Sequence, residues 1–476
     1  MSNKFTIIQG GMGAGVSNWK LARAVSQAGE LGVVSGTALD QILARRLQDG
    51  DPEGEMRRAL DAFPFAAMAD RVRDKYFVTG GKPAYAPYLT LPPHELNSPR
   101  ALTELCIVAN FVEVFLAREG HTNAVGINYL EKIQAPLLPG IFGAMLAGVD
   151  YVLMGAGIPL RVPGVLDRLS QHQAVEYTMH VTGALDGDDI ELRFDPNDFA
   201  EGAVPRLRRP KFLAIVSSNT LAATMMKRAN GRVDGLIIEM RSAGGHNAPP
   251  RGKLQLSLVG EPIYGERDHV DVAKLNELDV PFWLAGGYGH PERLQEALRL
   301  GAAGVQVGTA FEFAVESGLR QDYKQALLAT VVAGESKVFT DPLASPTGFP
   351  FKVASLEGTA SEQEVSDGRP RICDLGFLRE AYRTIEGDIG YRCPAEPLSV
   401  YCSKGGKEED TVGRKCICNA LLANIGLGQT RNGQRSEPGL VTAGDDLPFV
   451  SNFLRPGNAS YSAADVISKI AAAPSI

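Results

Sequence analysis

Short apolar runs and amphipathic segments alternate along the first 335 residues of the chain. Runs that are apolar throughout are typical of strands buried on both faces of a parallel sheet. Most of them precede a segment with apolar residues at i, i+3 and i+4, which predicts an amphipathic helix; Leu294, Ala297 and Leu298 form such a stripe. The eight predicted strands are Phe5–Gln9, Leu31–Ser35, Asn123–Asn128, Tyr151–Met154, Phe212–Val216, Leu236–Glu239, Phe282–Ala285 and Gly304–Val307.

Eight strand–helix repeats favour an α/β protein with a closed (β/α)8 TIM barrel, whose active site lies at the carboxyl ends of the strands. A doubly wound open sheet is the alternative, and it usually carries one glycine fingerprint after its first strand. Here the turn Gly10–Gly15 reads GGMGAG and lacks the G-x-G-x-x-G pattern. Glycine turns instead follow the last two strands, where barrels commonly bind phosphate. The sequence therefore predicts the barrel.

Two segments depart from the repeat. About eighty residues between the second and third strands show only helical patterns, and we predict an inserted helical subdomain over residues 37–121. The barrel then comprises residues 1–36 and 122–335. Prolines break residues 336–476 into short pieces, and we expect this cysteine-containing C-terminal extension to pack near the barrel mouth. The finer predictions are helices at Ala38–Leu47, Glu55–Arg73 and Arg100–Arg118, a hairpin of Val175–Val181 and Ile190–Phe194, and a loop at Ala360–Arg369.

Two glycine turns are candidate phosphate contacts. Gly286–Gly287 ends the seventh predicted strand, and Gly308–Thr309 ends the eighth. Glycine lets a phosphate approach backbone N–H groups, and a following helix N-terminus adds favourable partial charge. The alternative for either turn alone is that its glycines only close a tight loop. Side by side at the carboxyl edge of a sheet, the two turns would form a phosphate cradle.

The residues at the predicted strand ends form a set. They are Gln9, Gly10, Gly11, Met12, Asn128, Ser217, Glu239, Gly244, Gly245, His246, Gly286, Gly287, Gly308 and Thr309. Together with the segments IIQGGMGAGVSNWKLARAVSQAGELGVVSG, VGIN, AGGHN, LAGGY and LGAAGVQVGTAF, this set resembles the nitronate monooxygenase family, formerly called 2-nitropropane dioxygenases, and the related flavin-dependent enoyl-ACP reductases. The resemblance covers about the first 335 residues, apart from the helical insertion.

The resemblance implies an FMN-binding barrel that acts as an oxidoreductase. The FMN phosphate would rest on Gly286–Gly287 and Gly308–Thr309. The turn Gln9–Met12 would flank the isoalloxazine ring, and Asn128 would reach its polar edge. The implied cofactor site is completed by Ser217, Glu239, Gly244 and Gly245. His246 matches the family's catalytic histidine, and histidine suits proton transfer because its unperturbed pKa of ~6.5 lies near neutrality. The alternative for His246 is a loop residue that bonds backbone carbonyls.

Two departures from the family leave the reaction open. His246 is followed by Asn247–Pro250 where the family usually has a further glycine, and Gly11 stands where many nitronate monooxygenases have proline. Polyunsaturated-fatty-acid-type enoyl reductases also carry a polar, proline-containing continuation after the histidine. The first hypothesis is oxidation of a nitronate or nitroalkane with O2. The alternatives are reduction of an enoyl thioester of acyl carrier protein or coenzyme A with NAD(P)H, and a barrel that only binds a partner.

Composition narrows the classes of partner. A net charge of −7 over 476 residues disfavours nucleic acid and an anionic membrane surface. The first strand is preceded by no apolar leader, and no segment is apolar enough to span a bilayer. We therefore expect a cytoplasmic protein with a small-molecule substrate.

Five of the six cysteines fall in the last quarter of the chain. After Cys373, the residues Cys393, Cys402, Cys416 and Cys418 are spaced C-x8-C-x13-C-x-C. Thiolate clusters can hold zinc or an iron–sulfur centre, but structural zinc sites usually show C-x2–4-C pairs, and only the last pair comes close. Buried or loop thiols are the favoured interpretation, and no metal site is predicted.

Overall fold

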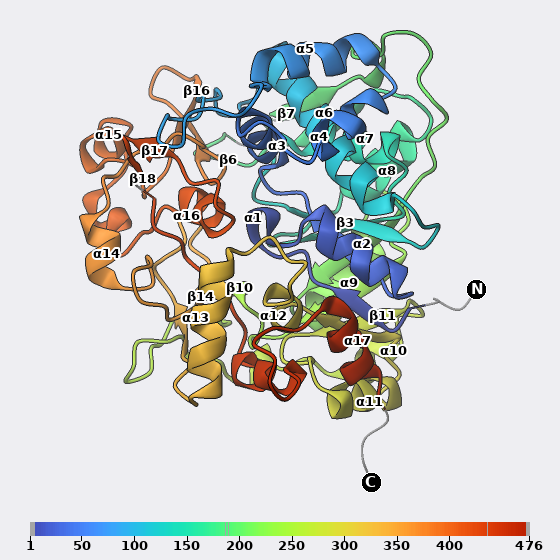
Figure 1. Ribbon diagram of the computed structural model, residues 1–476, viewed down its shortest axis with the longest axis vertical. Coiled ribbons are helices and arrows are strands. Elements are labelled where there is room, and N and C mark those ends of the chain that lie inside the picture. The colour runs from blue at the N-terminus through green and yellow to red at the C-terminus, as the bar shows by residue number, and fades with distance from the viewer. Residues whose placement is uncertain (1–4, 186, 189, 436, 473–476) are drawn as a thin grey trace.

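The computed structural model describes residues 5–185, 187–188, 190–435 and 437–472, and its centre is a parallel eight-stranded barrel (Figure 1). All eight predicted strands are confirmed. They follow one another in the order β1-β12-β11-β9-β8-β4-β3-β2. Their bounds are β1 Ile7–Gln9, β2 Gly32–Ser35, β3 Val125–Leu130, β4 Tyr151–Gly155, β8 Lys211–Val216, β9 Gly235–Glu239, β11 Phe282–Ala285 and β12 Gly304–Val307.

The barrel closes between its first two strands. A single parallel bridge joins Ile8 to Leu31, and the backbone N–H of Gln9 donates to the carbonyl of Leu31 at 3.0 Å. The Gln9 side chain continues this seam, because its Oε1 accepts the backbone N–H of Val33 at 2.9 Å. The interior is filled by one apolar cluster of Phe5, Ile8, Leu31, Val33, Tyr151, Leu153, Leu213, Ile237, Trp283 and Ala285.

Helices surround the barrel as an outer ring. The Asn18 side chain caps α2 by accepting the N–H of Leu21 at 2.9 Å, and Ser218 caps α9 in the same way. In α11, Leu294 and Ala297 are buried as predicted, whereas Leu298 lies at the edge of the apolar stripe and is exposed. The ring helices are α2 Trp19–Gln27, α6 Arg100–Arg118, α7 Leu137–Leu146, α8 Val162–Leu169, α9 Asn219–Arg228, α10 Val272–Asn276, α11 Pro291–Arg299 and α12 Thr309–Glu312.

The segment between β2 and β3 is helical, and it begins with α3 Leu39–Gln48. The helix predicted at Glu55–Arg73 is instead two helices, α4 Glu55–Asp61 and α5 Ala66–Tyr76. Pro64 divides them, because a proline disfavours helical geometry in the residue before it. The last helix of the segment, α6, packs against both α2 and α7. It therefore also belongs to the ring around the barrel.

The predicted hairpin is present but shorter than expected. β5 Val175–Thr178 pairs antiparallel with β7 Glu191–Phe194. The end of the first predicted run is a separate strand, β6 Val181–Thr182, which pairs with β15 Glu380–Arg383 of the extension. The excursion therefore contacts the C-terminal part of the chain.

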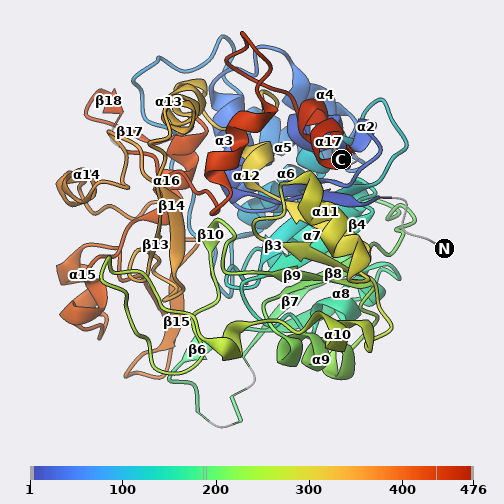
Figure 2. The same ribbon diagram turned by 90° about the horizontal axis from the view of Figure 1, so that it is seen from below.

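The C-terminal extension lies mostly on one side of the barrel, as Figures 1 and 2 show. Its last helix, α17, returns to pack against α2 and α11. The predicted loop Ala360–Arg369 contains a short helix, α14. After α13 Gln321–Val332, the elements are β13 Val338–Asp341, β14 Phe351–Ala354, α14 Gln363–Gly368, β15, β16 Ile389–Arg392, α15 Leu398–Ser403, the 3-10 helix η3 Glu408–Thr411, α16 Ile417–Asn424, β17 Thr430–Arg431, β18 Gln434–Arg435, the 3-10 helix η4 Leu447–Phe453 and α17 Ala463–Ala471.

The extension is joined to the barrel by a small antiparallel sheet. The two-residue strand β10 Gly245–His246 pairs with β14, so that His246 lies opposite Phe351, and β14 also pairs with β13. A loop of the barrel is thereby held by the C-terminal part of the chain. Among the helices of the described residues, none is both long and apolar enough to cross a membrane.

Candidate active site

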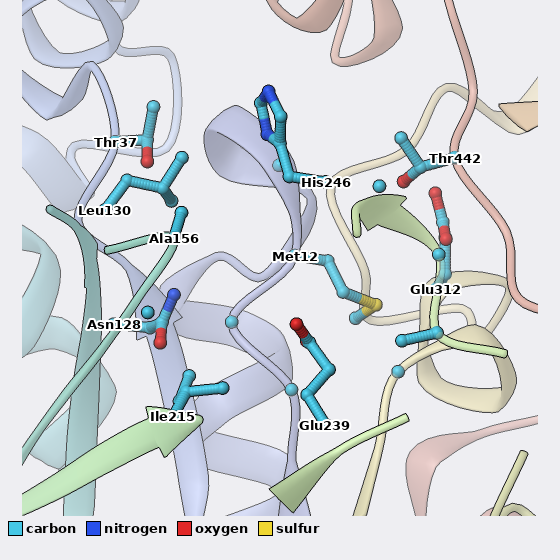
Figure 3. Close-up of a pocket in the computed structure, with 18 of the residues that line it drawn as sticks. Met12, Thr37, Asn128, Leu130, Ala156, Ile215, Glu239, His246, Glu312 and Thr442 are labelled. Atoms are coloured by element: carbon cyan, nitrogen blue, oxygen red, sulfur yellow. The ribbon is translucent and has the colours of Figure 1, made fainter. Parts of the chain in front are cut away.

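A cavity of about 210 Å³ opens at the carboxyl ends of the barrel strands (Figure 3). Most of the residues predicted for the site line it. They are Gly10, Gly11, Met12, Asn128, Glu239, Gly244, Gly245, His246, Gly286, Gly287, Gly308 and Thr309. Segments far apart in the sequence therefore meet at one place.

Two predicted site residues do not line the cavity. The Gln9 side chain is fully buried in the β1–β2 seam, where its Nε2 donates to Ser17 Oγ at 2.7 Å. Ser217, the residue directly after β8, also lies outside, and Ile215 of that strand lines the cavity instead. Alternate residues of a strand point the same way, but Ser217 follows the end of β8, where this alternation no longer holds.

One wall of the cavity is built from backbone. Gly286 and Gly287 have φ values of +88° and +71°, a region that residues with a side chain rarely adopt. A Cβ atom on Gly286 would lie 2.9 Å from the carbonyl oxygen of Met240. A Cβ atom on Gly10 would lie 3.4 Å from the Cα of Gly308, so the turns after β1 and β12 are close neighbours. We call Gly286, Gly287 and Gly308 the glycine wall.

The charged groups that line the cavity are acidic and are wholly or partly buried. Burial raises the pKa of Glu239 to about 7. Burial also raises the pKa of Glu312 to about 8, against a smaller opposing effect of Lys324. The pKa of Asp446 is raised by burial too, although the Thr309 hydroxyl bonds its carboxylate and opposes the shift. Among the described residues, the lining includes no lysine or arginine.

Asn128 brings an unpaired polar atom to the cavity. Its side chain is 7% exposed, and its Oδ1 atom has no hydrogen-bond partner within the described residues. It packs on Gly11, where an added Cβ atom would lie 2.3 Å from the Asn128 Cβ. A buried oxygen without a partner is costly, so it suits a ligand that donates a hydrogen bond. Gly11 is what leaves room for this amide.

His246 stands on the other side of the cavity from Glu239 in Figure 3. Its Nε2 atom lies 2.7 Å from Ser345 Oγ, and its ring centroid lies 4.8 Å from that of Phe351. Burial lowers the pKa of His246 to about 4. This pKa lies well below the unperturbed value of ~6.5 for histidine, so the imidazole is neutral at pH 7. His246 and Phe351 line the cavity, and we call them, together with the Ser345 hydroxyl that contacts His246, the histidine wall.

Several lining residues were not expected from the sequence. They include Ile215, Glu312, Phe351, Leu421, Thr442 and Asp446. Most come from the extension, whose sequence has no strand–helix repeat to indicate a shared edge. One signal was present: the run Leu440–Val441 is followed by Gly444–Asp446, an apolar run ending in glycine and polar residues as at the barrel strand ends.

Comparison with known proteins supports the resemblance seen in the sequence. Residues 169–338 match the family model for nitronate monooxygenase. This part of the barrel is similar in sequence to nitronate monooxygenases. A probable nitronate monooxygenase of Bacillus subtilis is 32% identical over 128 residues, which are 27% of this chain and 35% of the relative. A nitronate monooxygenase of Pseudomonas aeruginosa is 27% identical over 206 residues, 41% of this chain and 54% of the relative.

One further relative carries a different name. A (3aS,4S,5R,7aS)-5-hydroxy-7a-methyl-1-oxo-octahydro-1H-indene-4-carboxyl-CoA dehydrogenase of Rhodococcus jostii is 30% identical over 117 residues, 25% of this chain and 29% of that protein. The chain thus matches from about a third to about half of the length of these curated relatives. The nitronate monooxygenase match includes His246 and the glycine wall, and it ends before β14.

Proposed function

We propose that this chain is an FMN-dependent oxidoreductase of the nitronate monooxygenase type, with His246 as its acid–base residue. The observation that carries the proposal is a neutral histidine facing the same cavity as the glycine wall. The glycine wall would hold the FMN phosphate through backbone N–H groups. Asn128 Oδ1 would accept a hydrogen bond from the polar edge of the ring, which gives its orphaned oxygen a partner.

His246 would act on the substrate as a base. A neutral imidazole has a free ring nitrogen that can take the proton alpha to a nitro group. Ser345 Oγ bonds Nε2 and orients the ring. FMN, when bound, supplies the electron-transfer chemistry, and O2 is the proposed acceptor of the electrons. The surrounding apolar side chains exclude water from the proton transfer.

A second candidate function is reduction of an enoyl thioester, with NAD(P)H as electron donor and acyl carrier protein or coenzyme A as carrier. The lining chemistry favours it, because no lysine or arginine of the described residues is there to neutralise an anionic nitronate. Phe377, Leu378 and Leu421 of the extension add an apolar side to the mouth. One protein similar to this chain is named as the dehydrogenase of a carboxyl-CoA compound, which is a thioester. In this reaction His246 would protonate or hydrogen-bond the enolate.

The two candidates are separated by reducing the purified yellow protein without oxygen. The nitronate proposal expects a small nitronate or nitroalkane to bleach the flavin spectrum, and air to restore it. Bleaching by NADPH but not by nitronates would overturn it in favour of the reductase. A colourless protein that cannot be reconstituted with FMN would overturn both.

A further inference from the structure

A second cavity, of about 100 Å³, lies within the C-terminal extension, where residues of α14 and α16 form part of its lining. Its charge is opposite to that of the barrel cavity. Among the described residues, four cationic side chains line it against a single carboxylate, that of Asp367. The cations are Arg369, Arg371, Arg414 and Lys415. We call this cavity the basic pocket.

Arg369 already has a counter-charge inside the protein. Its Nε and Nη2 atoms donate to the two carboxylate oxygens of Glu437, at 2.5 Å and 3.1 Å. The Glu437 side chain is only 2% exposed, so this pair is a fixed part of the wall. The other three cations face only Asp367 within the lining, which leaves the basic pocket with a surplus of two positive charges.

Lys415 is the most deeply buried of these three cations. It is 6% exposed, and within the described residues it forms no ion pair. Its Nζ donates to the carbonyl of Ala360 at 2.7 Å, which satisfies one of its three N–H groups. The carboxylates of Asp341 and Asp367 act on its charge, but neither is within ion-pair distance. A buried ammonium without an adjacent counter-charge is costly, so it suits an anion in the pocket.

The two remaining guanidinium groups are held by backbone carbonyls. Arg414 Nη1 donates to the carbonyls of Leu343 at 2.7 Å and Ser345 at 2.6 Å. Arg371 Nη2 donates to the carbonyl of Thr411 at 3.3 Å. Carbonyl oxygens fix the position of a charge without neutralising it. Each guanidinium keeps N–H groups that the described residues do not use, in the planar fork that matches phosphate oxygens.

We propose that the basic pocket binds a phosphate group, either as free phosphate or as the phosphate monoester of a larger ligand. A phosphate monoester carries about −1.5 to −2 charges at neutral pH, which matches the surplus of the pocket. A carboxylate carries a single negative charge and would leave part of the surplus uncompensated. This inference does not depend on the reaction proposed for the barrel.

The basic pocket adjoins the histidine wall. Cys416 lines the basic pocket, and Cys418, two residues later, lines the barrel cavity. Arg414 bonds the carbonyl of Ser345, and the hydroxyl of the same residue lies 2.7 Å from His246 Nε2. A phosphate held by Arg414 would therefore be connected to His246 through one intervening residue.

The test is binding of inorganic phosphate to the full-length protein, measured by isothermal titration calorimetry. Potassium chloride keeps the ionic strength constant, because salt screens such contacts. FMN is added in excess so that the glycine wall does not take up phosphate. We expect one phosphate to bind per chain. No binding at millimolar phosphate would overturn the proposal.

Substitutions of opposite sign locate the site. Arg371→Gln and Lys415→Gln should each weaken phosphate binding by at least about tenfold, because each removes a charge-assisted hydrogen bond. Asp367→Asn should instead strengthen binding severalfold, since it removes the carboxylate that faces the anion. Lys337→Gln is the matched control, because this lysine of the extension is exposed and does not line the pocket.

Circular dichroism and FMN content of each variant report folding of the chain and of the barrel. Arg371 is half-buried and makes a single bond, so its variant keeps the test decisive if the Lys415 variant does not fold. Wild-type affinity in the folded Arg371 variant, an equal loss in the Lys337 variant, or weaker binding in the Asp367 variant would each overturn the proposal.

Coenzyme A and dephospho-coenzyme A, which lacks only the 3′-phosphate, identify the source of the phosphate. Displacement of inorganic phosphate by coenzyme A alone would support a site for the monoester of a thioester carrier. Displacement by neither compound would support a site for free phosphate. Equal displacement by both would show that the pocket does not select a phosphate monoester, and it would overturn the proposal.

Discussion

The glycine wall and the histidine wall of the cavity are built in different ways. The glycine wall consists of backbone at neighbouring barrel strand ends, and its shape follows from the absence of side chains. The histidine wall consists of side chains, and β14 of the extension holds it by pairing with β10. The barrel alone can therefore form the first wall but not the second. The proposed cofactor site and the proposed acid–base residue therefore depend on different parts of the chain.

His246→Asn should give the largest effect and tests whether the histidine wall carries the chemistry. Turnover should fall by about 10²–10⁴-fold, because a general acid–base group contributes that much. FMN should remain bound, since the glycine wall is unchanged. Steady-state kinetics and the flavin spectrum measure both outcomes.

Two controls accompany this substitution. His172→Asn changes a histidine that does not line the cavity and has a φ of +58°, a conformation that asparagine tolerates, and it should leave turnover intact. In the wild type, a base with a pKa of about 4 is protonated only below that pH. Activity should therefore fall on the acid side near pH 4 instead of near pH 6.5. An acid limb near 6.5, or a fully active Asn variant, would contradict the assignment.

Gly286→Ala tests the glycine wall. The new Cβ atom would force a side chain into a φ of +88° and to 2.9 Å from the Met240 carbonyl. Backbone strain of this kind costs about 1–3 kcal/mol, and we expect FMN affinity to fall at least about tenfold. Gly334→Ala is the control, because its φ is +73° but no atom lies within 4 Å. If both variants bind FMN as the wild type does, the glycine wall is not the anchor.

Glu312→Gln tests whether the acids near the glycine wall are held neutral. Burial raises the pKa of Glu312 from its ordinary 4.5 to about 8 in the folded chain. Stability from this group is therefore present below pH 4.5 and is lost as pH rises through 8. Between pH 6 and pH 8, the free energy of unfolding of the FMN-free variant should fall by about 1–2 kcal/mol less than that of the wild type. Thermal unfolding at the two pH values measures this, with exposed Glu335→Gln as the control that should behave as wild type.

Ser345→Ala should have the smallest effect and examines how the histidine wall is oriented. Removing one hydrogen bond of about 1 kcal/mol should slow turnover about fivefold. Thr347→Val removes a hydroxyl that bonds Ser345 Oγ at 2.8 Å, and it should slow turnover less. The reverse order of effects would show that the Ser345 bond does not orient His246.

The barrel could be predicted from the sequence because its strands are uninterrupted apolar runs that end in glycine or polar residues. The predicted helix bounds were wrong where a single residue interrupted the pattern, because Pro64 divides one predicted helix into α4 and α5. The glycine wall was predictable for the same reason as the strands, since neighbouring parallel strands end at one edge.

The histidine wall could be predicted only in part. His246 stood out in its glycine-rich loop, but its pKa depends on burial by segments that follow about a hundred residues later. Ser345 and Phe351 lie in a proline-broken stretch without any periodic pattern. Nothing in that stretch indicates that β14 pairs with β10.

The pairing of β10 with β14 sets an order of events during synthesis on the ribosome. Ser345 follows His246 by 99 residues, a stretch that takes from about five to about twenty seconds to translate. All eight barrel strands emerge during or before this interval. The nascent chain can thus complete its glycine wall while His246 still lacks its partners. A newly made barrel would acquire the proposed flavin pocket before the proposed acid–base residue is positioned.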